Sequence, residues 1–260
     1  MGQQSQTLTQ AASLTVAATD DASGVVGGEY FIGLTDPGQG NGTAMSWDSA
    51  NLTASFDTSL TVGQYRVNVR AIDAAGNWST VESSDLVVFD ATGLTDVAGS
   101  KQVVPQLASG DSLPGLLSDT QNDKANLSFD IAYTATGSIS PISYLTLDYS
   151  TGKSCNSPHP DNCHETQFTV NTVSPNMFDW LTITGPGSSL GTSQGQGTLT
   201  VDGVTTTNPF KILASDGDRT TPASADNAVL YIHAPGANPS TDSPLYQLHV
   251  NGNGNLVKIQ

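Results

Sequence analysis

The chain has 260 residues, of which 37% are hydrophobic and 12% are charged, and its formal net charge is −16 at pH 7. This length is enough for two cores of ordinary domain size. Because acidic residues outnumber basic ones by 24 to 8, the chain repels phosphate backbones and anionic headgroups, so we expect no nucleic-acid partner. No apolar run reaches the roughly 18 residues that a membrane helix needs, so we expect no membrane span.

Short strand-like runs separated by turn residues occupy the first part of the chain. We expect strands at residues 14–18, 29–34, 52–56, 65–72 and 86–89. The fourth run alternates strictly, with apolar residues at Tyr65, Val67, Val69 and Ala71 and polar residues at Gln64, Arg66, Asn68 and Arg70. This period of two predicts a strand with one buried side and one side in water. Several such strands in sequence are typical of a β-sandwich.

The alternation stops after residue 89, where Gly, Ser, Asp and Pro become frequent. We therefore expect a first domain at residues 1–92, a linker at 93–100 and a second domain at 101–260. In the second domain, strand-like runs lie at 126–134, 145–149, 168–170, 178–184, 199–201, 210–214, 229–233, 245–250 and 256–259. The fold class predicted is all-β, with two tandem β-sandwich domains, the second a larger sandwich or jelly roll.

Four separated motifs in the first domain resemble those of bacterial Ig-like modules that accompany secreted and surface proteins. The motifs are Ala18–Val25, Glu29–Ile32, Asp36–Thr43 and Val69–Trp78. The second domain is similar, more loosely, to β-rich domains that close bacterial surface and anchor-bearing proteins, through Leu127–Tyr133, Phe178–Leu181, Gly195–Gly203, Ala214–Gly217 and Gly252–Ile259. The resemblance implies an Ig-like first sandwich and an extracellular location, secreted or at the cell surface.

Two groups of acidic and amide residues are candidate calcium ligands, because Ca²⁺ takes six to eight oxygen ligands in proteins. The first group is Asp20, Asp21, Asp73 and Asn77, and the second is Asp216, Asp218 and Asp226. The alternative for the first group is that Asp73 and Asn77 only cap their own turn. For the second group it is a plain Asp-Gly turn, since Arg219 and Thr220 break the EF-hand pattern.

The two cysteines, Cys155 and Cys163, are close in sequence, and in a secreted chain such a pair predicts a local disulfide. The alternative is a zinc site formed together with His159 and His164, although adjacent Cys163 and His164 point apart on an extended backbone. Trp47 lies in a polar run and is the best candidate for an exposed ring that stacks on sugars.

The sequence shows no recognisable catalytic motif, so we do not expect an enzyme. The leading hypothesis is a non-catalytic extracellular spacer, adhesion or assembly module of a larger secreted or cell-surface bacterial protein, with the other domains of that protein as partners. One alternative is a carbohydrate-binding accessory module of a secreted hydrolase, which would bind polysaccharide. Another is a subunit of a surface layer or filament, which would associate with itself through exposed strand edges.

Overall fold

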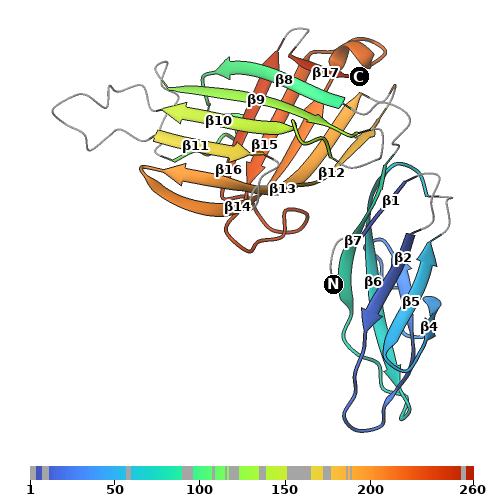
Figure 1. Ribbon diagram of the computed structural model, residues 1–260. Coiled ribbons are helices and arrows are strands. Elements are labelled where there is room, and N and C mark those ends of the chain that lie inside the picture. Colours follow the sequence, from blue (N-terminus) through green and yellow to red (C-terminus); the bar gives the residue numbers. More distant parts are fainter. Residues whose placement is uncertain are drawn as a thin grey trace. The chain divides into compact units, whose positions relative to one another are not determined.

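The computed structural model describes residues 4–7, 12–56, 60–89, 96–106, 109–114, 116, 123–134, 139–150, 165–171, 177–185, 187, 189–252 and 256–260. These residues form seventeen β-strands and short turns (Figure 1), so the predicted all-β fold is confirmed. The chain divides into two compact units, Met1–Asp90 and Ala91–Gln260. No helix in the described part is long and apolar enough to cross a membrane.

The described residues of unit 1 form seven strands in the order β1-β7-β6-β3-β4-β5-β2 across the sheet. Their bounds are β1 Gln4–Thr7, β2 Ala12–Ala17, β3 Val25–Ile32, β4 Thr43–Trp47, β5 Asn51–Phe56, β6 Gly63–Asp73 and β7 Glu82–Phe89. Strand β4 turns the corner between two layers, because its first residues pair with β3 and its last two pair with β5. Strands that change sheet in this way make the corners of sandwiches.

The core of unit 1 lies between these two layers. Leu14 and Leu52 come from β2 and β5, while Val67, Val69 and Leu86 come from β6 and β7, and all five are almost fully buried. The apolar half of the alternation in β6 therefore faces the core, as its period of two predicts.

The first and last strands of unit 1 are neighbours and run in the same direction. Gln4 pairs with Leu86 and Thr7 pairs with Phe89, which makes β1–β7 a parallel pair. The other pairs in this sheet are antiparallel.

In the part of unit 2 that the structure describes there are ten strands, in the order β16-β15-β14-β13-β11-β10-β9-β8-β17, with β12 paired to β13 beside this path. Their bounds are β8 Asp96–Val103, β9 Lys124–Ala132, β10 Tyr144–Ser150, β11 Glu165–Val170, β12 Met177–Thr184, β13 Leu190–Val201, β14 Val204–Ser215, β15 Asp226–Ile232, β16 Tyr246–Gly252 and β17 Val257–Ile259. All of these pairs are antiparallel.

The sheet of unit 2 curls so that β8–β11 lie across β13–β16 (Figure 1). Side chains from both halves form one core, in which the ring of Phe210 meets those of Phe168 and Phe178 edge to face. Edge-to-face pairs of this kind add to the stability that burial alone provides. Gly197 of β13 lies against this group, and a Cβ there would be 2.3 Å from the Phe168 ring, so only glycine fits.

The linker expected at residues 93–100 overlaps strand β8, which begins at Asp96 and pairs with β9 and β17. Its low apolar content hid this strand from the sequence pattern. Packing explains why residue 99 in this strand is glycine, because a Cβ there would lie 2.6 Å from the ring of Phe129. In the structure, the division between the two units falls between Asp90 and Ala91.

Candidate functional site

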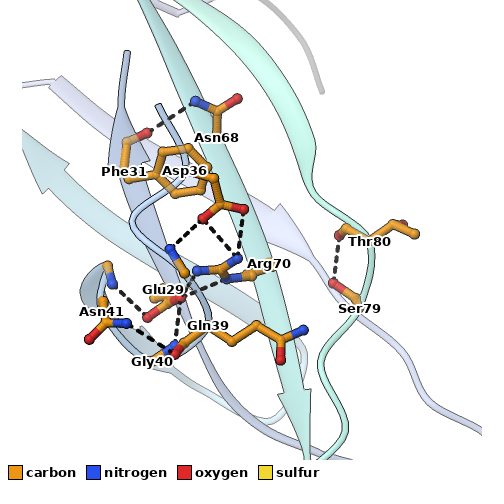
Figure 2. Close-up of polar contacts among 12 residues, drawn as sticks. Glu29, Phe31, Asp36, Gln39, Gly40, Asn41, Asn68, Arg70, Ser79 and Thr80 are labelled. Carbon is orange, nitrogen blue, oxygen red and sulfur yellow. Dashed lines mark hydrogen bonds and ion pairs between the residues drawn. The ribbon is translucent and has the colours of Figure 1, made fainter. Parts of the chain in front are cut away.

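A group of charged and aromatic side chains in unit 1 lies on the outer face of β3 and β6, beneath the loop of residues 33–42 (Figure 2). Glu29 and Arg70 are direct neighbours in the sheet register, and both are almost fully buried. We call Glu29, Asp36, Asn68 and Arg70, with the rings of Phe31 and Trp78, the Arg70 cluster.

Arg70 joins the sheet to the loop. Its Nε donates to Oε1 of Glu29 at 2.6 Å, and its Nη1 lies 3.1 Å from each carboxylate oxygen of Asp36. The guanidinium carbon lies 5.6 Å from the ring centroids of both Phe31 and Trp78. A buried guanidinium needs such partners, because an unpaired buried charge costs several kcal/mol.

Glu29 secures the other end of the same loop. Its two carboxylate oxygens accept hydrogen bonds from the backbone N–H groups of Gly40 and Gly42 at 3.0 and 2.9 Å. Gly42 must be glycine, since a Cβ there would lie 2.9 Å from the carbonyl oxygen of Tyr30. Both carboxylate oxygens are thus engaged, and the geometry favours a structural role for this acid over proton transfer.

Asn68 completes the cluster and shows where the sequence pattern was wrong. Its side chain donates to the carbonyl of Gly33 at 2.8 Å and accepts from the hydroxyl of Ser83 at 2.7 Å. Asn68 is 5% exposed and Arg70 is 3% exposed, so this face is not in water at these positions. The loop covers it, a contact between distant parts of the chain that local alternation does not record.

The first predicted calcium group is only partly assembled. Asp20, Asp73 and Asn77 line a hollow of about 200 Å³ together with Trp78 and Ser79, whereas Asp21 is exposed and does not line it. Asp73 accepts hydrogen bonds from the backbone N–H and the side-chain amide of Asn77, at 2.7 and 2.9 Å. The turn-capping alternative for Asp73 and Asn77 therefore describes their contacts.

Hydrogen bonds also stabilise the ionised form of both acids at this hollow. The backbone N–H groups of Gly24 and Ser23 lower the pKa of Asp20. The side-chain amide and then the backbone N–H of Asn77 lower the pKa of Asp73. Both carboxylates are charged at neutral pH, which gives the hollow a negative wall beside the indole of Trp78.

Two members of the second predicted calcium group are buried and accept hydrogen bonds from backbone N–H groups at the last strand, β17. Asp226 accepts from the N–H of Gly217 with one oxygen and from the N–H groups of Leu256 and Val257 with the other, at 2.7 to 3.0 Å. Asp216 accepts from the N–H of Ile259 at 3.1 Å. The carboxylate oxygens thus face backbone donors, while Asp218 is exposed on the 3₁₀ turn Gly217–Arg219.

A third buried acid plays the same part at the other edge of unit 2. One oxygen of Asp111 accepts from the backbone N–H of His249 at 2.6 Å and lies 3.0 Å from Nδ1 of its ring. The other oxygen accepts from the N–H of Gln106 at 2.7 Å. Next to it, Ser112 and Gln247 exchange two backbone hydrogen bonds, so this segment covers edge strand β16.

The remaining predicted site residues are Trp47, Cys155 and Cys163. Trp47, the predicted sugar platform, is half-buried in β4 and packs against the core of unit 1. Cys155 and Cys163, predicted to form a disulfide, lie outside the described residues. Within the described ranges, no three His, Cys, Asp or Glu side chains lie close enough together to hold a metal ion, so calcium stays a prediction.

The sequence pattern did not identify the Glu29–Arg70 pair or Asp111, and it named Asp216 and Asp226 without the backbone N–H groups that they bind. A signal for the pair was available. The chain has only 8 basic residues, so an arginine in the middle of an alternating strand requires an acidic partner if that face is covered. No comparable signal existed for Asp111 and Asp226, because their partners are backbone groups far away in sequence.

Comparison with known proteins adds nothing to this geometry: no family model matches the chain, and no curated protein or solved structure matches it.

Proposed function

We propose that the chain is a non-catalytic, extracellular spacer module of a larger secreted or cell-surface protein. The observation that supports this proposal is that four buried carboxylates bind backbone N–H groups. Glu29, Asp111, Asp216 and Asp226 all hold loops or strand ends in place through backbone N–H groups. The chain has few charged residues, and these buried carboxylates form hydrogen bonds that fix the backbone. Such a chain is suited to keeping one rigid folded shape.

The tandem arrangement supports the same proposal. Each unit has its own buried core. In unit 2 the last strand, β17, is held by side-chain carboxylates as well as by its backbone pairing with β8. A folded unit keeps its end-to-end length until a force unfolds it, whereas a flexible Gly/Ser linker coils and shortens. The module would thus hold a partner domain at a distance from its anchor.

A tethering assay tests the proposal. The full chain is placed between a cell-surface anchor and a small reporter that captures ligand-coated beads under flow, and a Gly/Ser linker of the same number of residues is the control. We expect the folded chain to support more bead capture than the linker. Equal capture would contradict a spacer role, and capture without the reporter would indicate an adhesive module instead.

The hollow at Asp20, Asp73, Asn77 and Trp78 favours a second candidate, a carbohydrate-binding module. The hollow has a volume of about 200 Å³ and is lined by carboxylates, an amide, a hydroxyl and an indole, and a few polar groups beside an aromatic ring are typical of small-ligand pockets. Carboxylates and amides bind hydroxyl groups well, and aromatic faces pack against the apolar face of a sugar.

Glycan-array binding tests this second candidate with matched variants. Asn77→Ala removes an amide at the hollow, and Asn41→Ala removes one from the exposed part of the loop of residues 33–42. Sugar binding that is lost in the first variant and kept in the second would support the candidate. No binding to plant, fungal or bacterial polysaccharides would count against it.

A further inference from the structure

The terminal strands of the two units are paired in different ways. In unit 1 the terminal strands β1 and β7 are parallel neighbours, with Gln4 beside Leu86 and Thr7 beside Phe89. In unit 2 the terminal strands β8 and β17 are antiparallel neighbours, with Val97 beside Ile259. The direction in which a pulling force meets the hydrogen bonds follows from these two pairings.

When unit 1 is pulled through the chain at both ends, the force enters before Gln4 and leaves after Phe89. Because β1 and β7 are parallel, these two points lie at opposite ends of the pair, so the force slides one strand along the other. The hydrogen bonds between parallel strands are evenly spaced across this direction. Up to about four of them therefore resist together before any gives way.

When unit 2 is pulled between Asp96 and Gln260, the two points lie side by side. These residues exchange two backbone hydrogen bonds, Asp96 N–H to Gln260 at 2.9 Å and Gln260 N–H to Asp96 at 3.0 Å. Force here opens the strand pair from its end. In an antiparallel ladder the bonds come in close pairs, so about two break at each step.

We infer that unit 1 is a tension-bearing element in which the β1–β7 pair is a shear clamp, and that unit 2 is a weaker element that unzips first. This inference rests on the proposed spacer function and extends it to a spacer under load. On release, unit 2 would lengthen the tether while unit 1 stays folded.

The surroundings of the β1–β7 pair support the clamp. Strand β7 is bonded on its other side to β6 along seven residues, and its Val87 and Val88 are fully buried. Strand β1 also contacts β2, the strand at the opposite edge of the unit 1 sheet. Strand β7, which would take up the load from β1, is thus fixed to β6 on the side away from the clamp.

Single-molecule force spectroscopy of the full chain, with handles before Gln4 and after Gln260, tests the inference. At roughly 3.4 Å for each residue, unit 2 should release about 560 Å of chain and unit 1 about 300 Å, so the two events are distinguishable by length. We expect the longer event first and the shorter one at roughly twofold higher force, from about four bonds against about two. Unfolding of unit 1 at or below the force of unit 2 would overturn the clamp.

A change of pulling direction is the matched control, because it alters no residue of the clamp. A handle attached through an unnatural amino acid at Ala75, an exposed position in the β6–β7 turn, loads β1 and β7 from the same end. Pulling between this handle and the N-terminus should peel β1 away at roughly half the force. An equal force in both directions would overturn the inference.

Two proline variants probe the bonds themselves. Backbone groups of neighbouring residues in a strand face opposite sides, so only one of Ser5→Pro and Gln6→Pro removes an N–H that bonds β7. We expect one variant to lower the unfolding force of unit 1 and the other to lower it much less. A spacer that passes the bead assay while these force tests fail would remain a spacer without a clamp, and a failed bead assay would instead remove the spacer.

Discussion

Both units bury carboxylates, but they stabilise them differently. In unit 1, Glu29 pairs with the buried guanidinium of Arg70 at 2.6 Å. In unit 2, Asp226 is fully buried and accepts three hydrogen bonds from backbone N–H groups. The ion pair in unit 1 removes two charges from water. In unit 2 only the charge of Asp226 is removed from water, and its carboxylate provides an acceptor for backbone N–H groups near the end of the sheet.

The difference follows from composition. With 24 acidic residues and 8 basic ones, most carboxylates in this chain have no cation to pair with. Buried acids must then find neutral donors, and backbone N–H groups at strand ends and turns are the most abundant ones. Arg70 shows what a cation adds, because it reaches Glu29 on the sheet and Asp36 on the loop at once.

The largest effect is expected from Asp226→Ala in unit 2. The substitution leaves the N–H groups of Gly217, Leu256 and Val257 without their acceptor, and each unsatisfied buried donor costs about 1 to 3 kcal/mol. We expect unit 2 to lose about 4 kcal/mol of unfolding free energy, measured by calorimetry with the unit 1 transition as an internal reference. Asp218→Ala, exposed on the adjacent turn, is the control and should change it by less than about 0.5 kcal/mol.

A loss below about 1 kcal/mol in Asp226→Ala would show that these N–H groups find other partners, and would weaken the contrast between the units.

A smaller effect is expected from Glu29→Gln in unit 1. The amide keeps the shape and one acceptor for the loop, but it leaves Arg70 with only the half-exposed Asp36 as a charged partner. Removing one partner of a buried ion pair costs about 3 kcal/mol, which should lower the unit 1 transition and leave that of unit 2 unchanged. Glu82→Gln, on the exposed start of β7, is the matched control.

A double-mutant cycle with Arg70→Met sharpens this prediction. If the two side chains act as a pair, the double variant should be less destabilised than the sum of the two single ones. Strict additivity would mean that Glu29 acts through Gly40 and Gly42 alone, as Asp226 acts through backbone groups in unit 2.

The sequence predicted the strands better than it predicted their surroundings. The run expected at 178–184 is β12, Met177–Thr184, because its alternation of apolar residues is local information. Strand β4 was missed, since Thr43–Trp47 has only five residues and shows no strict alternation. The water-facing role expected for Asn68 and Arg70 was wrong because a loop more than thirty positions away covers them, and no local pattern records such a contact.

The same limit applies to the candidate sites. Asp73 and Asn77 were identified with their turn-capping alternative, since an Asx cap depends only on residues a few positions apart. Asp216 and Asp226 were candidate calcium ligands, and the pattern did not reveal their hydrogen bonds with backbone N–H groups of Leu256, Val257 and Ile259, which lie 30 to 43 positions away. Sequence identifies a carboxylate but not the distant donor that uses it.

The smallest effect is expected at Asp96, whose buried Oδ1 has no hydrogen-bond partner among the described residues. Burial, and then the nearby charge of Asp130, raises its pKa from 3.8 to about 6. Between these pH values the folded state keeps a proton that the unfolded state has lost. The stabilising contribution of the protonated form is therefore complete below about pH 4 and is lost as the pH rises through about 6.

Asp96→Asn should remove this pH dependence. Because Asp96 is only half-buried, solvent screening reduces the effect, and we expect unit 2 to gain about 1 kcal/mol at pH 8 and almost nothing at pH 4. Melting of unit 2 at the two pH values measures it, with the exposed Asp148→Asn as control. The same gain at both pH values would show that the substitution acts through packing, and the unpartnered Oδ1 of Asp96 would then not set this carboxyl of unit 2 apart from the paired Glu29 of unit 1.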